Sequence, residues 1–322
     1  MMKKIFTILA ASMLAFSFVT AQNKIERETF MYAEKDGQKL HLDTYVDHSM
    51  EYEGKRPVMI YVHGGGFSMG SRINALQIKY NKHFATQGFV SISIDYRKEL
   101  KAGESADQPS VLRAINYATE DLFDATAFIL KKAEEWNIDT EKIIISGGSA
   151  GAVACLNAEY EICNSTELAS RLPKGFNYAG IVSQAGCITV PKDSLEWQTA
   201  PCPILLMHGD KDLQVPYENY SIEGNLYAGS NYIHKQLVEM DTPHWLYIEA
   251  GADHIVALKP LQYNFSEIDA FIDKFVIKGE HAMVHTVWTD KEPGSMEKMF
   301  EIVPLYMIGW EKTDEEVEAE KK

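Results

Sequence analysis

The stretch KIIISGGSAGAVA at residues 142–154 decides the fold of this chain. An isoleucine-rich run, typical of a buried strand, passes through the turn GGSAG at 147–151 into small residues that favour a tightly packed helix. A G-x-S-x-G turn between a strand and a helix is sharp and lifts the serine hydroxyl clear of the sheet. We therefore predict that Ser149 is a nucleophile, although the motif alone also occurs in ordinary glycine-rich turns.

Strands and helices alternate along most of the chain. A hairpin is expected around Asp36-Gly37, a helix over Glu120–Trp136 and a last helix from Ser266 to Lys278. Strands that are apolar on both faces, separated by helices, indicate a mainly parallel sheet covered on both sides, which is a three-layer αβα sandwich. The expected core strands are Val58–Val62, Val90–Ile94, Lys142–Ile145, Ala179–Ser183, Ile204–Met207 and Trp245–Ile248.

A second glycine-rich motif, HGGGF at residues 63–67, directly follows the first of these core strands. Glycines let the backbone approach a reacting carbonyl, so we expect the N–H groups of Gly65 and Gly66 to join that of Ala150 in an oxyanion hole. A phosphate-binding loop is the alternative, but no Gly-Lys-Ser/Thr sequence follows. We expect His63 to hold this loop rather than to act as a base.

A serine nucleophile needs a base within hydrogen-bond reach, and in this fold class the base follows the last core strand. His254 is the only histidine in the loop after Trp245–Ile248, so we assign it as the base. Of the other histidines, His208 stands at a strand end, where a bracing role is expected. His234 falls in an expected helix and His244 in the turn before a strand.

The base in turn needs a carboxylate that fixes its tautomer and stabilises its cation. The loop HGDKDLQVP at residues 208–216 follows the strand Ile204–Met207 and offers two candidates, Asp210 and Asp212. We assign Asp212, which lies deeper in the loop, and keep Asp210 as its rival.

Five motifs in this order resemble those of the α/β-hydrolase superfamily, in particular bacterial carboxylesterases related to hormone-sensitive lipase and the feruloyl and acetyl-xylan esterase-like hydrolases near them. The resemblance runs from about Lys39 to Lys278, and its motifs are HGGGF, DYR at 95–97, GGSAG, HGDKDLQVP and GADH at 251–254. It implies a mostly parallel sheet of the eight-stranded type, the triad Ser149, Asp212 and His254, and a structural role for DYR behind the site. One departure is Gly148, where an acidic residue often precedes the serine.

These motifs predict a serine carboxylic-ester hydrolase that works through an acyl-enzyme, with no metal or organic cofactor. By analogy with the family, its substrates would be small esters or glycans bearing acetyl or feruloyl groups. A peptidase or amidase of the prolyl-oligopeptidase-like type and a non-catalytic hydrolase-fold binding protein are the alternatives. Tyr217, Tyr220, Tyr227 and Tyr232 could stack on a sugar or aryl group, or could be ordinary core and surface residues.

The N-terminus is typical of a secretory signal peptide, with Lys3 and Lys4 before an apolar run and a cleavage site after Ala21. We therefore expect a periplasmic or secreted protein without a membrane span after cleavage. The formal net charge is −15, which makes nucleic acid an unlikely partner. The sequence divides into a signal peptide (1–21), a catalytic domain (22–280) and a C-terminal extension (281–322).

Two features stay open from sequence alone. The extension could form a small hairpin around Pro293-Gly294, a dimer contact or a partly disordered tail, and nothing in it indicates a particular oligomeric state. An exported chain allows disulfides, for which Cys187 with Cys202 is the favoured pair, but four buried free thiols are an equal expectation. Cys155 and Cys163 are expected to share one helix, too far apart to bond.

Overall fold

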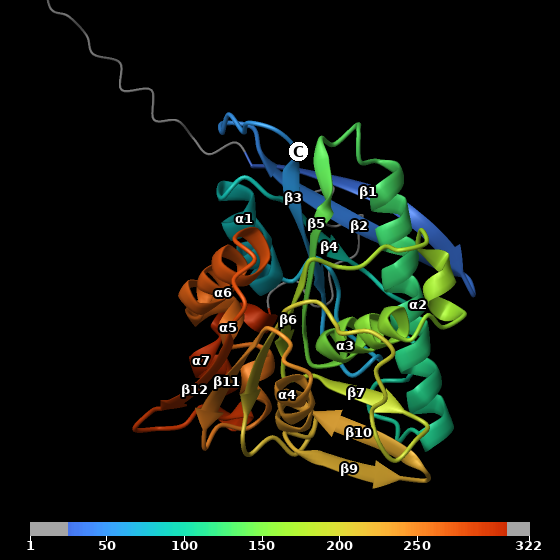
Figure 1. Ribbon diagram of the computed structural model, residues 1–322, viewed down its shortest axis with the longest axis vertical. Coiled ribbons are helices and arrows are strands. Elements are labelled where there is room, and N and C mark those ends of the chain that lie inside the picture. The colour runs from blue at the N-terminus through green and yellow to red at the C-terminus, as the bar shows by residue number, and fades with distance from the viewer. Residues whose placement is uncertain (1–24, 308–322) are drawn as a thin grey trace, which may run out of the picture.

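A nine-stranded sheet forms the middle layer of the protein in the computed structural model, which describes residues 25–307 (Figure 1). The signal peptide and the acidic chain end expected from sequence lie outside the described residues. Along the sheet the strands are β1 (Ile25–Lys35), β2 (Gln38–Asp47), β4 (Val90–Ile94), β3 (Arg56–Val62), β5 (Ile138–Gly148), β6 (Gly180–Gln184), β8 (Ile204–Gly209), β11 (His244–Ala250) and β12 (Met283–Thr289).

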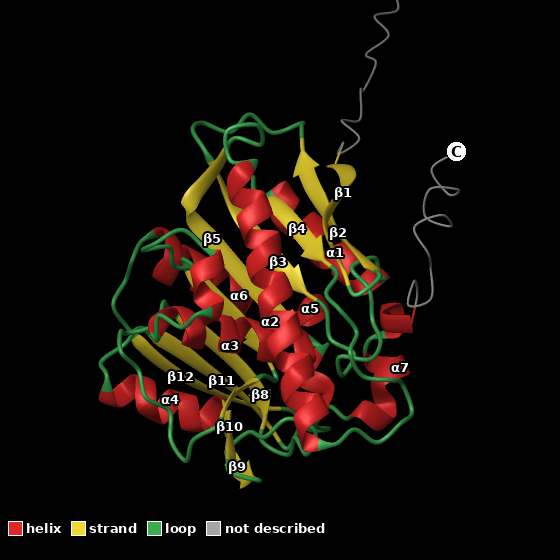
Figure 2. Ribbon diagram, turned by 90° about the vertical axis from the view of Figure 1, so that its right-hand side faces the viewer, coloured by secondary structure: helices red, strands yellow, loops and turns green. Residues whose placement is uncertain are grey.

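Helices cover both faces of this sheet, as Figure 2 shows for the face toward the viewer. The helices of that face are α2 (Gln108–Lys131), α3 (Ala150–Cys163) and α4 (Ser230–Glu239). On the other face pack α1 (Ala75–Thr86), α5 (Pro260–Tyr263) and α6 (Phe265–Phe271), the last continuing as a π-helical turn over Ile272–Ile277. The sequence prediction of a three-layer αβα sandwich is confirmed.

The strand pattern follows from the local sequence. The β1–β2 hairpin turns through Asp36 and Gly37, both with positive φ (51° and 75°), which is the backbone that a two-residue hairpin turn requires. β2 also pairs antiparallel with β4, and every later pair in the large sheet is parallel. All six core strands expected from apolar runs are present.

Two helix boundaries differ from the sequence prediction. α2 begins at Gln108 rather than Glu120, because Asp107 accepts a hydrogen bond from the Ser110 amide and Pro109 occupies the first turn. The helix ends at Lys131, five residues before the predicted end at Trp136.

A second, smaller sheet lies at the bottom of the molecule in Figure 1. Its three antiparallel strands are β7 (Cys187–Val190), β10 (Asn225–Gly229) and β9 (Asn219–Ile222). Asn157 of α3 fastens β7 by accepting from the Thr189 amide and donating to the Cys187 carbonyl. This sheet therefore stands beside the ends of the parallel strands, where α/β folds carry their sites.

The C-terminal extension adds to the large sheet. Its first stretch is β12, which pairs in parallel with β11, whereas the residues after Pro293-Gly294 form short helical turns at Met296–Lys298 and Met299–Ile302. The hairpin considered from sequence is therefore wrong. The four cysteines are buried and free, which settles the choice between a disulfide and free thiols. Within residues 25–307, no helix has both the length and the apolar character needed to cross a membrane.

A buried charge network joins the β1–β2 hairpin to α2. Asp121 is fully buried and accepts hydrogen bonds from the Arg97 amide (2.8 Å), the Arg97 guanidinium and Lys35 Nζ (2.8 Å). Arg97 also pairs with Glu120 and Asp36. Because Asp121 is fully buried and two cations converge on it, its removal takes a buried partner from both Arg97 and Lys35.

We expect Asp121→Ala to lower the free energy of unfolding by about 3 kcal/mol, because Arg97 and Lys35 lose a buried partner. Urea denaturation measures the change. Glu134→Ala is the control, because that side chain is 87% exposed and, within the described part of the chain, pairs only with Lys55, so its change should stay within about 0.5 kcal/mol. Equal changes in the two variants would contradict the role of the network.

Candidate active site

Ser149, His254 and Asp212 form one hydrogen-bonded chain. His254 Nε2 lies 2.8 Å from Ser149 Oγ, and His254 Nδ1 lies 2.6 Å from Asp212 Oδ2. An ionised carboxylate only accepts, so the Nδ1–H donates to Asp212 and leaves Nε2 to accept the Ser149 hydroxyl proton. The structure thus brings together the three residues that sequence assigned as nucleophile, base and acid.

Asp212 is held in place by its own loop and by a second histidine. Its Oδ1 accepts from the amides of Gln214 (2.8 Å) and Val215 (3.0 Å), and His208 Nε2 lies 3.3 Å from Oδ2. Burial alone would raise the pKa of Asp212, but the hydrogen bonds from His208 and His254 outweigh it and hold that pKa well below its ordinary value. Asp212 is therefore a fixed anion at neutral pH.

The rival carboxylate, Asp210, has a different partner. Its Oδ1 accepts from the Gly251 amide at 2.6 Å, which ties the loop after β8 to the loop after β11. His208 braces the same region through Ser230 Oγ (2.7 Å) and the Val215 carbonyl (3.2 Å). Of the two aspartates, Asp212 is the one that reaches the imidazole of His254.

The turn at Ser149 is strained and tightly enclosed. Its φ of 53° and ψ of −123° lie where L side chains are rare, and its amide donates to the Gln184 carbonyl at 2.9 Å. A Cβ at Gly151 would lie 2.0 Å from the Val62 carbonyl oxygen, and one at Gly148 would lie 2.2 Å from that of Ala257. The second contact explains why no acidic residue precedes the serine here.

Gly148→Ala should reduce kcat for a p-nitrophenyl ester by at least about tenfold, because the turn that carries His254 must move away from the new Cβ. Steady-state kinetics measures the loss, and circular dichroism shows whether the fold is kept. An unchanged kcat in a folded Gly148→Ala protein would show that this contact places no demand on the site.

The HGGG loop lies directly against Ser149. A Cβ at Gly64 would stand 3.4 Å from Ser149 Cβ, and Gly65 and Gly66 have positive φ values of 119° and 60°. Among residues 25–307, the amides of Gly65, Gly66 and Ala150 donate none of the hydrogen bonds found. These donors, with the N-terminus of α3, are therefore available to an anionic oxygen at Ser149.

His63 supports this loop from beneath. Its ring is fully buried, stacks on Tyr96 with ring centroids 4.3 Å apart and makes a 2.7 Å hydrogen bond with the Gly64 carbonyl. Tyr96 OH donates to the His63 carbonyl, and its neighbour Asp95 pairs with Arg72. The DYR motif therefore lies behind the site, as its resemblance implied.

Burial lowers the pKa of His63 to about 4, below the ordinary value of about 6.5. Below pH 6.5 the unfolded chain takes up a proton that the folded chain resists, so stability falls as the pH drops toward 4. We expect His63→Gln to be less stable at pH 7 but to lose about 1.5 kcal/mol less than wild type between pH 7 and pH 5. Urea denaturation at both pH values tests this, and parallel losses would contradict it.

The four tyrosines considered from sequence separate into different surroundings. Tyr220 and Tyr227 stack with ring centroids 4.8 Å apart across β9 and β10, and Gln108 donates to Tyr227 OH. Tyr217 packs edge-on against His208, while Tyr232 packs against the core. Tyr220 is 46% exposed, so the stacked pair offers one accessible aromatic face.

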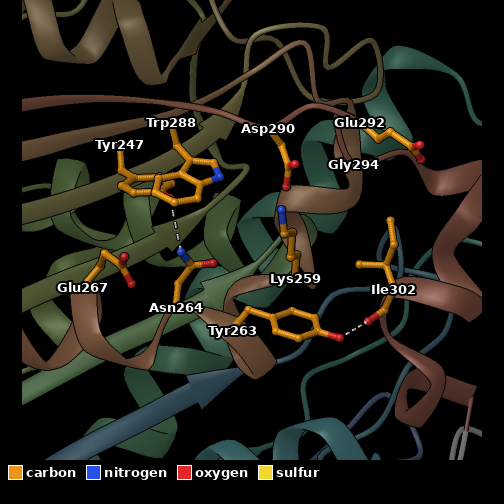
Figure 3. Close-up of a pocket in the computed structure, with 10 residues that line it drawn as sticks. All are labelled: Tyr247, Lys259, Tyr263, Asn264, Glu267, Trp288, Asp290, Glu292, Gly294 and Ile302. Atoms are coloured by element: carbon orange, nitrogen blue, oxygen red, sulfur yellow. Dashed lines mark hydrogen bonds between the residues drawn. The ribbon is translucent and has the colours of Figure 1, made fainter.

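A cavity of about 420 Å³ lies away from the triad, between the C-terminal extension and α5 and α6 (Figure 3). Trp288, Tyr263 and Lys259 are among its lining residues, and Ser149, Asp212 and His254 are not. Sequence reasoning did not foresee this cavity, nor the backbone bond from Ser149 to Gln184, because both depend on segments far apart in the chain.

Comparison with known proteins places this geometry in a known fold. Residues 42–188 match the family model described as BD-FAE. Est2, an esterase of the Planctomycetes species Thermogutta terrifontis, superposes with a TM-score of 0.59 at 17% identity, covering 79% of this chain and 92% of that one. The apo form of the same esterase gives a TM-score of 0.57 at 18% identity, covering 79% and 95%. This chain has the α/β-hydrolase fold.

Curated relatives match this chain over short segments. The non-reducing polyketide synthase trt4 of Aspergillus terreus is 42% identical over 78 residues, 23% of this chain and 3% of that one. The synthase ausA of Emericella nidulans is 28% identical over 132 residues, 41% and 5% of the two chains. This chain therefore spans only a few per cent of those proteins. The family match and the structural neighbours agree on the fold of this chain.

Proposed function

We propose that this α/β-hydrolase is a serine carboxylic-ester hydrolase that works through an acyl-enzyme. The observation that carries the proposal is the unbroken hydrogen-bonded chain from Ser149 Oγ through His254 to Asp212. Such a chain activates an otherwise weakly acidic hydroxyl at neutral pH.

In the first half-reaction, His254 Nε2 takes the Ser149 proton as Oγ attacks the ester carbonyl carbon. The carbonyl oxygen becomes an oxyanion beside the amides of Gly65, Gly66 and Ala150, and Asp212 stabilises the imidazolium. Collapse of this intermediate breaks the bond to the alcohol, which receives the proton from His254. Water then attacks the acyl-enzyme with the same base and releases the acid.

The proposed substrates are short acyl esters, including acetyl and feruloyl groups on carbohydrate. Est2 has been solved with propionate and with butyrate bound, which supports a small acyl group here. The exposed Tyr220 face, stacked on Tyr227, offers a surface for a sugar or aryl ring. A signal peptide over residues 1–21 would bring the enzyme to the periplasm or the outside, where such glycans occur.

We expect Ser149→Ala and His254→Ala to lower kcat for p-nitrophenyl acetate by about 10⁴-fold or more, because each removes a group that acts in bond making. Asp212→Asn should lose about 10⁴-fold by favouring the wrong tautomer of His254, whereas Asp210→Asn should lose far less. Steady-state kinetics on the purified chain without residues 1–21 measures all four. Hydrolysis by Ser149→Ala at the wild-type rate would rule out the mechanism.

The substrate class is tested by a panel of p-nitrophenyl acetate and butyrate, methyl ferulate, acetylated xylan and an aminoacyl anilide. We expect the protein to hydrolyse the esters and not the aminoacyl anilide. Preference for the anilide would establish the peptidase alternative, and a folded protein inert toward every member and toward an organophosphonate probe would establish the binding-protein alternative.

A further inference from the structure

Asp253, the residue before His254, ties the His254 loop to the C-terminal extension. Its carboxylate accepts a hydrogen bond from Ser295 Oγ at 2.8 Å and from the Met296 amide at 2.9 Å. It also caps its own turn by accepting from the Ile255 amide at 3.0 Å. In return, the Asp253 amide donates to the Gly294 carbonyl at 3.3 Å. The side chain of Asp253 and its backbone amide thus both bind the segment 294–296.

The packing at this junction is close on both sides. A Cβ at Gly294 would lie 2.9 Å from Ile255 Cγ2 and 3.1 Å from Glu249 Oε1. A Cβ at Gly251 would lie 2.9 Å from Pro293 Cγ. The segment 293–296 therefore sits against the loop without space between them, and a shift of either one displaces the other.

The segment is itself firmly supported. It follows β12, which pairs with β11 from His244↔Met283 to Ala250↔Thr289, so both ends of the junction start from neighbouring strands of one sheet. Further along, Tyr263 OH donates to the Ile302 carbonyl at 2.9 Å, as Figure 3 shows. The extension thus forms a fixed wall beside the His254 loop.

The position of His254 depends on such support because this residue lies at the junction of a loop and a single 3₁₀ turn, His254–Ala257. It is not held within a long helix or a strand. The imidazole must reach Ser149 and Asp212 at once, at 2.8 and 2.6 Å, and a misplacement of about 1 Å can cost about 100-fold in rate. We propose that Asp253 is a positioning residue for His254, with segment 293–296 of the extension as its anchor. This inference rests on the esterase function proposed above.

The test compares four variants of the chain without residues 1–21 on p-nitrophenyl acetate. Asp253→Ala should lower kcat by about 30-fold with KM changed less than about threefold, because the base moves while the substrate surface does not. Ser295→Ala removes the bond to Asp253 and the cap on the Glu297 amide without a change of charge, and should lower kcat by about three- to tenfold. Asp253→Asn keeps an acceptor for the Met296 and Ile255 amides and should stay within about fivefold of wild type.

Asp290→Ala is the matched control. It removes an equal charge from the same extension, at an exposed side chain, and should change kcat by less than about twofold. Rates are divided by the concentration of active sites titrated with an organophosphonate, so that loss of folded protein does not count as loss of catalysis.

Two results would overturn the inference: an unchanged kcat per titrated site in Asp253→Ala, or equal losses in Asp253→Ala and Asp290→Ala. If Asp253→Ala does not fold, the inference is tested with Ser295→Ala and Asp253→Asn. A wild-type kcat in Ser295→Ala would then contradict the positioning role of Asp253. A wild-type protein that neither hydrolyses esters nor binds the phosphonate contradicts the proposed function instead, which keeps the two failures distinct.

Discussion

The sharp turn at Ser149 is the constraint on which the rest of the structure depends. A residue with φ of 53° between β5 and α3 can be enclosed only if its neighbours lack side chains. Gly151 then admits the carbonyl of Val62 at the end of β3, and Gly148 admits that of Ala257 after the proposed base. Two separate segments therefore meet at this turn, and together with it they carry the proposed oxyanion donors and the proposed base.

Carboxylates fix the loops around this turn by accepting backbone N–H groups. Asp210 accepts from Gly251, Asp212 from Gln214 and Val215, and Asp253 from Met296. Each satisfies amides that a loop would otherwise leave unpaired. Of these three aspartates, only Asp212 also accepts a hydrogen bond from an imidazole, that of His254. Its carboxylate therefore both closes a loop and belongs to the proposed proton-transfer chain.

The sequence predicted the features that depend on local pattern. The strand–turn–helix around Ser149, the apolar strands and the order of Asp212 and His254 all follow from short stretches, and the structure brings those residues together. A strand in the extension was considered as part of a hairpin, but its parallel pairing with β11 as the edge strand β12 could not be predicted, because pairing with a distant strand leaves no local pattern. Asp253 stands in the GADH motif, but its contacts with the extension could not be predicted, since its partners lie about 40 residues away.

Mapping a covalent adduct tests the central claim most directly. The purified chain without residues 1–21 is treated with a fluorophosphonate, digested and examined by mass spectrometry. The account predicts one phosphonyl group per chain, on the peptide that contains Ser149, with no adduct in Ser149→Ala and slow labelling in His254→Ala. An adduct on another residue, or equally fast labelling without His254, would contradict the claim that Ser149 is a nucleophile activated through His254.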